Sequence, residues 1–211
     1  MHQFDALLKV AEELNGPSGC PWDIKQTFAT LQPYVLEEAH ELMEAVDEND
    51  DQKMIEELGD LLYTIIFYGK IAEKNHRFTI GDVIERETEK LIRRHPHVFG
   101  NQRIQDIEGI VENWEKIKKE EDKNKGRKSP IEGIPKTLPA VAKAQKMVQK
   151  LKRTSFPDLP ESRNKMDAKT LREQFLHLIA QAEASGLDAE SELRRATADL
   201  ENAFRSWELN E

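Results

Sequence analysis

The sequence has very little cysteine and no long apolar run. Its 211 residues contain a single cysteine, Cys20, so the chain cannot form an internal disulfide. A chain of this length can bury a core without disulfides, and a lone cysteine is typical of a reducing compartment. No segment approaches the roughly 18 consecutive apolar residues of a membrane span, and the amino terminus lacks the pattern of a secretory signal. We therefore expect a cytoplasmic protein with no membrane partner.

Positive charge is also scarce. The net charge is −9 at pH 7, which opposes general attraction to nucleic acid phosphates and to anionic lipid. We therefore expect no nucleic-acid partner. A small nucleotide that carries Mg²⁺ stays compatible with this charge, because a metal ion and a few basic side chains can reverse the sign at one site.

Alternating strand patterns are almost absent. Hydrophobic residues make up 38% of the chain and charged residues 34%, and the apolar ones recur every three or four positions over long segments. This periodicity is typical of amphipathic helices, so we predict an all-α fold. Among these segments are Phe4 to Leu14, Ile80 to His95 and Ile107 to Ile117.

The segment from Leu31 to Ile71 has the pattern of two helices joined by a polar turn at residues 47–51. At 100° per residue, the apolar positions of each helix fall on one stripe that we expect to face the core. The stripes consist of Leu31, Tyr34, Val35, Leu42, Ala45 and Val46 in the first helix and of Met54, Leu58, Leu61, Ile65, Tyr68 and Ala72 in the second.

Four acidic side chains lie on or beside these stripes. Glu38 falls at the centre of the first stripe and Glu41 on its flank, while Glu57 stands at the edge of the second stripe with Asp60 beside it. A helical hairpin would gather them at the margin of a core, where uncompensated carboxylates are costly. Oxygen donors without a histidine or cysteine ligand favour Mg²⁺, with Mn²⁺ as a substitute. Spacing alone leaves open the alternative that these acids are solvated helix residues.

Several motifs resemble the MazG nucleoside triphosphate pyrophosphohydrolases, over about residues 1–120. They are CPWDIKQT at residues 20–27, YVLEEAHELMEAVD at 34–47, EELGDLL at 56–62 and KLIRRHPHVFG at 90–100. The resemblance implies a MazG-like helical bundle, a homodimer, and hydrolysis of a nucleoside triphosphate to a monophosphate and pyrophosphate. The family's metal pattern, E-x-x-E followed by E-x-x-D, falls on the same four acids that helical geometry selects.

Five basic or aromatic residues are candidates for substrate binding. Lys90 and Arg94 share a helical face, and the resemblance favours phosphate binding there over a solvated helix end. Trp22 either stacks on a base or plugs one end of the bundle. Trp114 and Lys118, one turn apart, are second candidates for base stacking and phosphate contact, with core packing as an equal alternative for Trp114.

Three parts are predicted along the chain. They are a MazG-like pyrophosphohydrolase domain at residues 1–125, a linker at 126–137 and a degenerate second MazG-like helical repeat at 138–211. In the last part, the short segment FPDLPESRNKMD stands where the family has its acidic helix. Thr197, Asp199 and Ala203 stand where the second repeat of the family usually offers Asn, Lys and Arg. We infer that this repeat packs or dimerises and that the chemistry is confined to the first domain.

The function that these residues favour is Mg²⁺-dependent hydrolysis of a nucleoside triphosphate between its α- and β-phosphates, for housekeeping of the nucleotide pool. The four acids would be both metal ligands and catalytic residues. The alternative is a catalytically weak, nucleotide-binding regulatory dimer. A di-iron site is suggested by Glu37 and His40 in an E-x-x-H spacing. It is disfavoured because His40 lies opposite Glu38 on the helical wheel.

Overall fold

The computed structural model of this chain is all-α in the part that it describes, as predicted. The described residues are 2–104, 106–121, 129–160 and 165–210. They form two compact units, residues 1–118 and 119–211. Residues 126–128 of the predicted linker lie outside the described part, as do residues 122–125 at the end of the predicted first domain.

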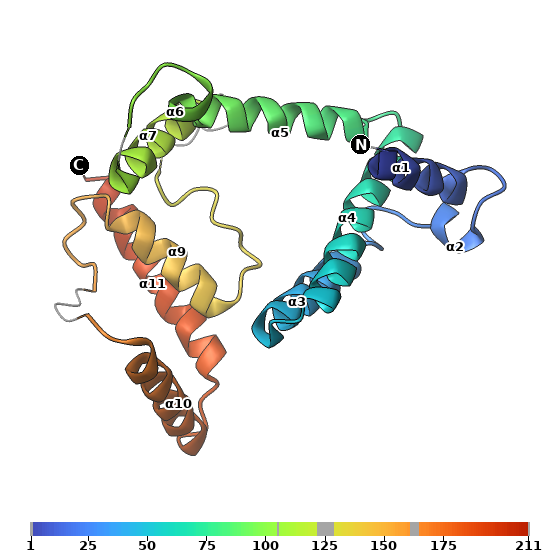
Figure 1. Ribbon diagram of the computed structural model, residues 1–211. Coiled ribbons are helices and arrows are strands. Elements are labelled where there is room, and N and C mark those ends of the chain that lie inside the picture. Colours follow the sequence, from blue (N-terminus) through green and yellow to red (C-terminus); the bar gives the residue numbers. More distant parts are fainter. Residues whose placement is uncertain (1, 105, 122–128, 161–164, 211) are drawn as a thin grey trace. The chain divides into compact units, whose positions relative to one another are not determined.

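The first unit is built from helices that follow one another through short connections (Figure 1). The helices are α1 (His2–Asn15), α2 (Pro21–Ile24), α3 (Gln32–Glu48), α4 (Asp51–Lys74), α5 (Ile80–Arg94), α6 (Pro96–Phe99) and α7 (Ile107–Glu120), the last of which extends two residues past the unit boundary. The longest of them, α4, packs against α1, α3 and α5. It is therefore the scaffold on which the rest of the unit is arranged.

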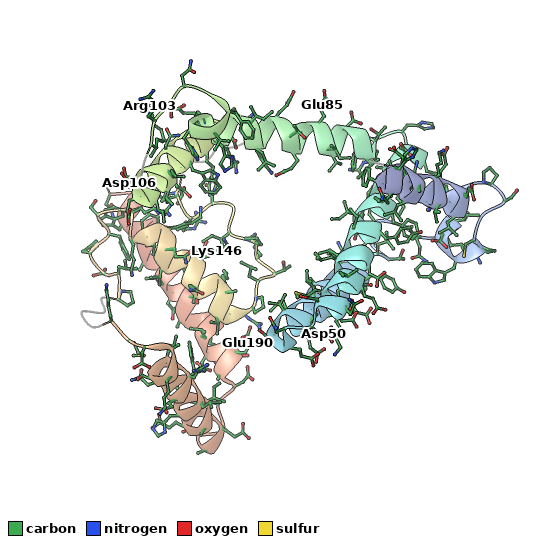
Figure 2. All side chains as sticks on the ribbon, viewed as in Figure 1. Asp50, Glu85, Arg103, Asp106, Lys146 and Glu190 are labelled. Carbon is green, nitrogen blue, oxygen red and sulfur yellow. The ribbon has the colours of Figure 1, made fainter. Side chains whose placement is uncertain are left out.

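The turn between α3 and α4 is short and strongly determined by its sequence. Asn49 ends α3 in the left-handed conformation, with φ 55°, which asparagine tolerates better than most residues. The Asp50 carboxylate then accepts hydrogen bonds from the backbone N–H groups of Gln52 at 3.0 Å and Lys53 at 3.1 Å, as an N-cap does. Figure 2 shows Asp50 at this turn. The predicted helical hairpin is confirmed, and its short turn sets which residues of α3 face α4.

A small aromatic core lies where α4 meets the segment before α3. Leu31, Phe67 and Ile71 are buried there, each less than 5% exposed, and Phe28 packs against them. On another side of α4, α1 buries Ala11 completely. These contacts hold the second half of α4, which leaves its first half to pair with α3.

The predicted inward-facing stripes are only partly correct. Leu31 and Ala45 are buried as expected, but Val46 is 55% exposed, Leu58 53% and Ile65 45%. Within the described part of the first unit, the helices that pack against α4 are α1, α3 and α5, and they leave these apolar side chains uncovered. The α3–α4 hairpin therefore presents an exposed apolar surface.

The second unit has its own core and one weakly attached helix. Its helices are α9 (Ala140–Leu151), α10 (Ala168–Ala184) and α11 (Ala189–Glu208). The side chains of Met147, Leu151, Phe156 and Phe204 form the centre of the core, where α9 and α11 lie side by side (Figure 1). In contrast, α10 contributes no buried residue.

Candidate metal and nucleotide site

Three carboxylates converge where α3 faces α4. One oxygen from each of Glu38, Glu41 and Glu57 lies within 4.8 Å of the others. Glu38 and Glu41 are three residues apart on α3 and therefore project from neighbouring positions of one helical face. Glu57 comes from the facing side of α4, which the hairpin turn brings opposite. The predicted proximity of these three acids is confirmed.

The fourth predicted acid, Asp60, lies beside this trio without joining its tightest group. The Asp60 charge contributes to raising the pKa of Glu38 and the pKa of Glu57, so its carboxylate lies within electrostatic range of both. Because Asp60 follows Glu57 by three residues on α4, its side chain projects from the same side of that helix. The structure thus places all four acids in one neighbourhood.

The trio carries uncompensated negative charge. The pKa of Glu38 is raised above its ordinary value, first by burial and then by the charges of Asp60, Glu41, Glu57 and Glu37. Every charged neighbour that shifts it is therefore another carboxylate. A cation bound between these groups would remove their mutual repulsion and favour their ionised form.

The pKa of Glu57 is raised for the same reasons. Partial burial is the largest cause, followed by the charge of Glu41, the charges of Glu56 and Asp60, and a hydrogen bond shared with Glu41.

The donor set at this site consists of carboxylate oxygens alone, which fits the hard cations Mg²⁺ and Mn²⁺ better than zinc or copper.

Trp22 is anchored on one side and open on the other. Its ring meets Tyr34 edge to face, with the centroids 5.7 Å apart, and lies 6.4 Å from the ring of buried Phe67. The side chain is nevertheless 50% exposed. The next residue, Asp23, is buried and accepts a hydrogen bond of 3.2 Å from the Tyr63 hydroxyl. Trp22 is therefore partly a packing residue, with ring surface left for a ligand.

The predicted phosphate-binding pair is divided between two environments. Lys90 forms an ion pair with Glu87 on its own helix. Arg94 is buried and places its guanidinium 5.1 Å from the centre of the Trp114 ring. Lys118 lies 4.6 Å from the same ring. Arg94, Trp114 and Lys118 thus form one group, which we call the basic–aromatic cluster. Each of the two cations is attracted by the face of the Trp114 ring.

Within one chain, the basic–aromatic cluster and the acids occupy different parts of the first unit. Glu57 and Asp60 lie in the first half of α4, whereas α5 follows the carboxyl end of that helix and Arg94 is its last residue. From Asp60 to the end of α4 the helix alone rises about 20 Å. The contacts described above for Lys90 and Arg94 therefore lie towards the other end of α4 from the acids within one chain.

Two features near the acids do not follow from the sequence pattern. Periodicity places Tyr34 on the apolar stripe of its helix, but Tyr34 contacts Trp22 and keeps 36% of its surface exposed. Its position four residues before Glu38 is the signal that the sequence offers. The second feature is the Asp23–Tyr63 hydrogen bond, which joins distant segments; burial together with the Asp23 charge raises the pKa of Tyr63 to about 12.

No helix in the described residues combines the length and the apolar character that crossing a membrane requires.

Comparisons with known proteins agree with the motifs. The MazG nucleotide pyrophosphohydrolase domain matches residues 26–99. The uncharacterized protein YabN of Bacillus subtilis is 49% identical over 69% of this chain and 30% of its own length. The nucleoside triphosphate pyrophosphohydrolase/pyrophosphatase MazG of Thermotoga maritima is 37% identical over 97% of this chain and 85% of its own length.

A third relative is the nucleoside triphosphate pyrophosphohydrolase of Escherichia coli K12. It is 40% identical over 74% of this chain and 60% of its own length. The chain therefore spans less than two thirds of the Bacillus and Escherichia relatives and most of the Thermotoga one.

Proposed function

This chain belongs to the MazG family of nucleotide pyrophosphohydrolases, and from that premise we propose that it hydrolyses nucleoside triphosphates to nucleoside monophosphates and pyrophosphate. The observation that carries the proposal is the convergence of Glu38, Glu41 and Glu57 within 4.8 Å. Such a group has no evident structural use, because its mutual repulsion opposes folding. A divalent cation bound to a triphosphate would turn that repulsion into attraction.

In the proposed mechanism, the four acids would hold the metal. Glu38, Glu41 and Glu57 supply the closely spaced oxygens, and Asp60 completes the set because its charge already acts on two of them. When bound there, Mg²⁺, or Mn²⁺ in its place, would supply positive charge for the phosphate oxygens and would lower the pKa of an attacking water. The protein's part is to fix the acids on two rigid helices before substrate arrives.

The remaining candidates bind the substrate in this proposal. Trp22 offers ring surface for a base, since half of its side chain is exposed. Lys90 and Arg94 would hold the departing pyrophosphate, and Trp114 and Lys118 would add stacking and phosphate contact. Basic groups are needed near the leaving group because charge accumulates there as the bond breaks.

A homodimer would bring these parts together. Apolar side chains that are more than a third exposed cover much of the α3–α4 hairpin, and patches of this kind mark interaction surfaces. They are Leu36, Met43, Val46, Ile55, Leu58, Leu62 and Ile65. A second copy would cover this surface and could also offer its own basic–aromatic cluster to the acids.

Light scattering after size exclusion should give twice the monomer mass of 24.4 kDa. A monomer would contradict this assembly.

The experiment for the proposed activity is product analysis with purified chain, common triphosphates and excess Mg²⁺. Equal amounts of monophosphate and pyrophosphate support α–β cleavage, and activity on damaged or surplus triphosphates would support a role in nucleotide-pool housekeeping. Binding without either product would instead support the catalytically weak regulatory dimer. Release of inorganic phosphate with a diphosphate would contradict the bond assignment.

A further inference from the structure

Tyr34 stands on α3 directly in line with the acids. It precedes Glu38 by four residues and Glu41 by seven. These intervals are close to one and two helical turns, so the three side chains project from the same face. At 1.5 Å per residue, the Tyr34 backbone is displaced from that of Glu38 by only about 6 Å along the helix axis.

Tyr34 also forms part of an aromatic surface with Trp22. The two ring planes cross at 79°, with the centroids 5.7 Å apart. Phe67, which is 2% exposed, lies against Trp22 at 6.4 Å. A hydrogen bond of 3.0 Å from the Gln26 amide to the Trp22 carbonyl helps to fix the short helix α2. The Trp22–Tyr34 pair is therefore held from the core side.

The outer side of this pair remains accessible. Trp22 is 50% exposed and Tyr34 is 36% exposed. Large aromatic side chains usually bury most of their surface in a protein, and nucleic acid bases stack on rings of this kind without regard to sequence. In addition, the Tyr34 hydroxyl makes no hydrogen bond to other described residues, and a phenol group can both donate to and accept from a base edge.

We infer that Tyr34 is a specificity-determining residue that forms, together with Trp22, the surface on which the base of a nucleoside triphosphate rests. The ring provides stacking area, and the hydroxyl forms a hydrogen bond with the edge of the base. This inference rests on the proposed function, because the acids one turn further along α3 place the phosphates. The competing interpretation is that Tyr34 only supports Trp22 by packing.

The test compares substrates with and without a base. In Tyr34→Ala, kcat/KM for nucleoside triphosphates should fall about 10-fold, the loss expected for one base-stacking ring. The loss should lie mainly in KM, because stacking is retained through the reaction. The rate with ribose 5-triphosphate, which has no base, should change less than twofold. If the Tyr34→Ala substitution lowers kcat/KM for this base-free substrate as much as it lowers kcat/KM for the nucleotides, Tyr34 is only a packing residue.

A second variant isolates the hydroxyl. Tyr34→Phe should keep the stacking. It should change the ratio of kcat/KM between two nucleoside triphosphates that differ in their base by about threefold or more, because one neutral hydrogen bond contributes a free energy of that size. Tyr68→Phe is the matched control, because the Tyr68 hydroxyl donates to the Phe28 carbonyl at 3.2 Å inside the core. That control should leave the base ratios unchanged. Unchanged ratios in Tyr34→Phe would overturn the assignment of the hydroxyl.

A binding measurement keeps this inference separate from the proposed activity. Equilibrium binding of an α,β-methylene triphosphate with Mg²⁺ requires no turnover, so it remains informative if the wild type releases no product. Tyr34→Ala should weaken this binding about 10-fold. If circular dichroism shows that Tyr34→Ala is misfolded, Tyr34→Leu keeps most of the packing volume and takes its place. Unchanged affinity in the folded variant would contradict the inference.

Discussion

The α3–α4 hairpin of the first unit and the α9–α11 pair of the second differ in what they do with their polar residues. The hairpin gathers three carboxylates at the seam between two helices. In the second unit, the seam is filled by apolar side chains such as Met147 and Phe204, each 1% exposed. The difference teaches that packing alone explains the α9–α11 seam, whereas the carboxylates between α3 and α4 oppose folding and call for another explanation, which the proposed metal site provides.

The second unit contains no counterpart of the α3–α4 hairpin among its described residues. No helix stands between α9 and α10 among the described residues, and α10 buries none of its side chains. Thr197 on α11 is 3% exposed and donates its hydroxyl to the Leu193 carbonyl at 2.7 Å. This residue therefore belongs to the core rather than to a ligand site.

The largest effect is expected from Phe204→Ala, which tests whether the second unit contributes only stability. Phe204 packs against Phe156 and Trp207 with centroid separations of 5.4 and 5.5 Å. Its loss should reduce the stability of the second unit by about 3 to 5 kcal/mol, because a large cavity remains. Urea denaturation measures this loss. Turnover of the folded fraction should stay within twofold of wild type. A selective loss of turnover would contradict the division of roles.

Next in size is Glu41→Gln in the first unit. Removing one charged oxygen from the trio should lower kcat by about 100-fold or more, the loss found when one preorganised electrostatic group is removed. Pyrophosphate release measures the rate. The matched control is Glu173→Gln on α10, which is exposed and should leave the rate unchanged. Equal rates in both variants would contradict the assignment of the acids.

A smaller effect is the pH dependence of stabilisation by Mg²⁺. Burial and acidic neighbours raise the pKa of Glu38 and Glu57 above the ordinary value of 4.5. The folded chain then binds protons more tightly than the unfolded chain, so these groups reduce stability as pH rises through and above 4.5. Bound Mg²⁺ should reverse this loss at neutral pH.

Thermal unfolding at different pH values measures this linkage. At pH 7 and ten times Kd, Mg²⁺ should add about 1.4 kcal/mol to the free energy of unfolding. The gain should shrink as pH falls towards 4.5, where the carboxylates become protonated. Glu41→Gln should reduce the gain at pH 7. An equal gain across the pH range would show that the metal binds elsewhere.

The smallest difference concerns two helix caps. Asp50 caps α4, and Asp167 caps α10 by accepting from the Thr170 N–H at 2.8 Å. Asp50→Ala should reduce the stability of the first unit by about 1 kcal/mol. Asp167→Ala should reduce the stability of the second unit by less, because α10 buries no side chain and can fray alone. Denaturant unfolding of both variants gives the two values, and a larger loss for Asp167→Ala would contradict this view of α10.

Local features of this chain could be predicted well from the sequence. The hairpin and the convergence of Glu38, Glu41 and Glu57 follow from helical periodicity and from the turn at Asn49 and Asp50. These depend on residues that are close in sequence, where geometry is nearly fixed.

Features that depend on distant partners could not be predicted. The exposure of Leu58 and Ile65 depends on which helices cover α4, and periodicity does not contain that information. The contacts of Trp22 with Tyr34 and of Arg94 with Trp114 join separate segments through irregular connections. Both contacts depend on the path of the chain between those segments, which periodicity does not determine.

The most direct measurement of the central claim is binding of Mn²⁺, followed by electron paramagnetic resonance. We predict that the free Mn²⁺ signal falls when wild-type protein is added and that the loss is much smaller with Glu38→Gln. A loss of signal that is the same in both proteins would show that the acids between α3 and α4 do not hold the metal.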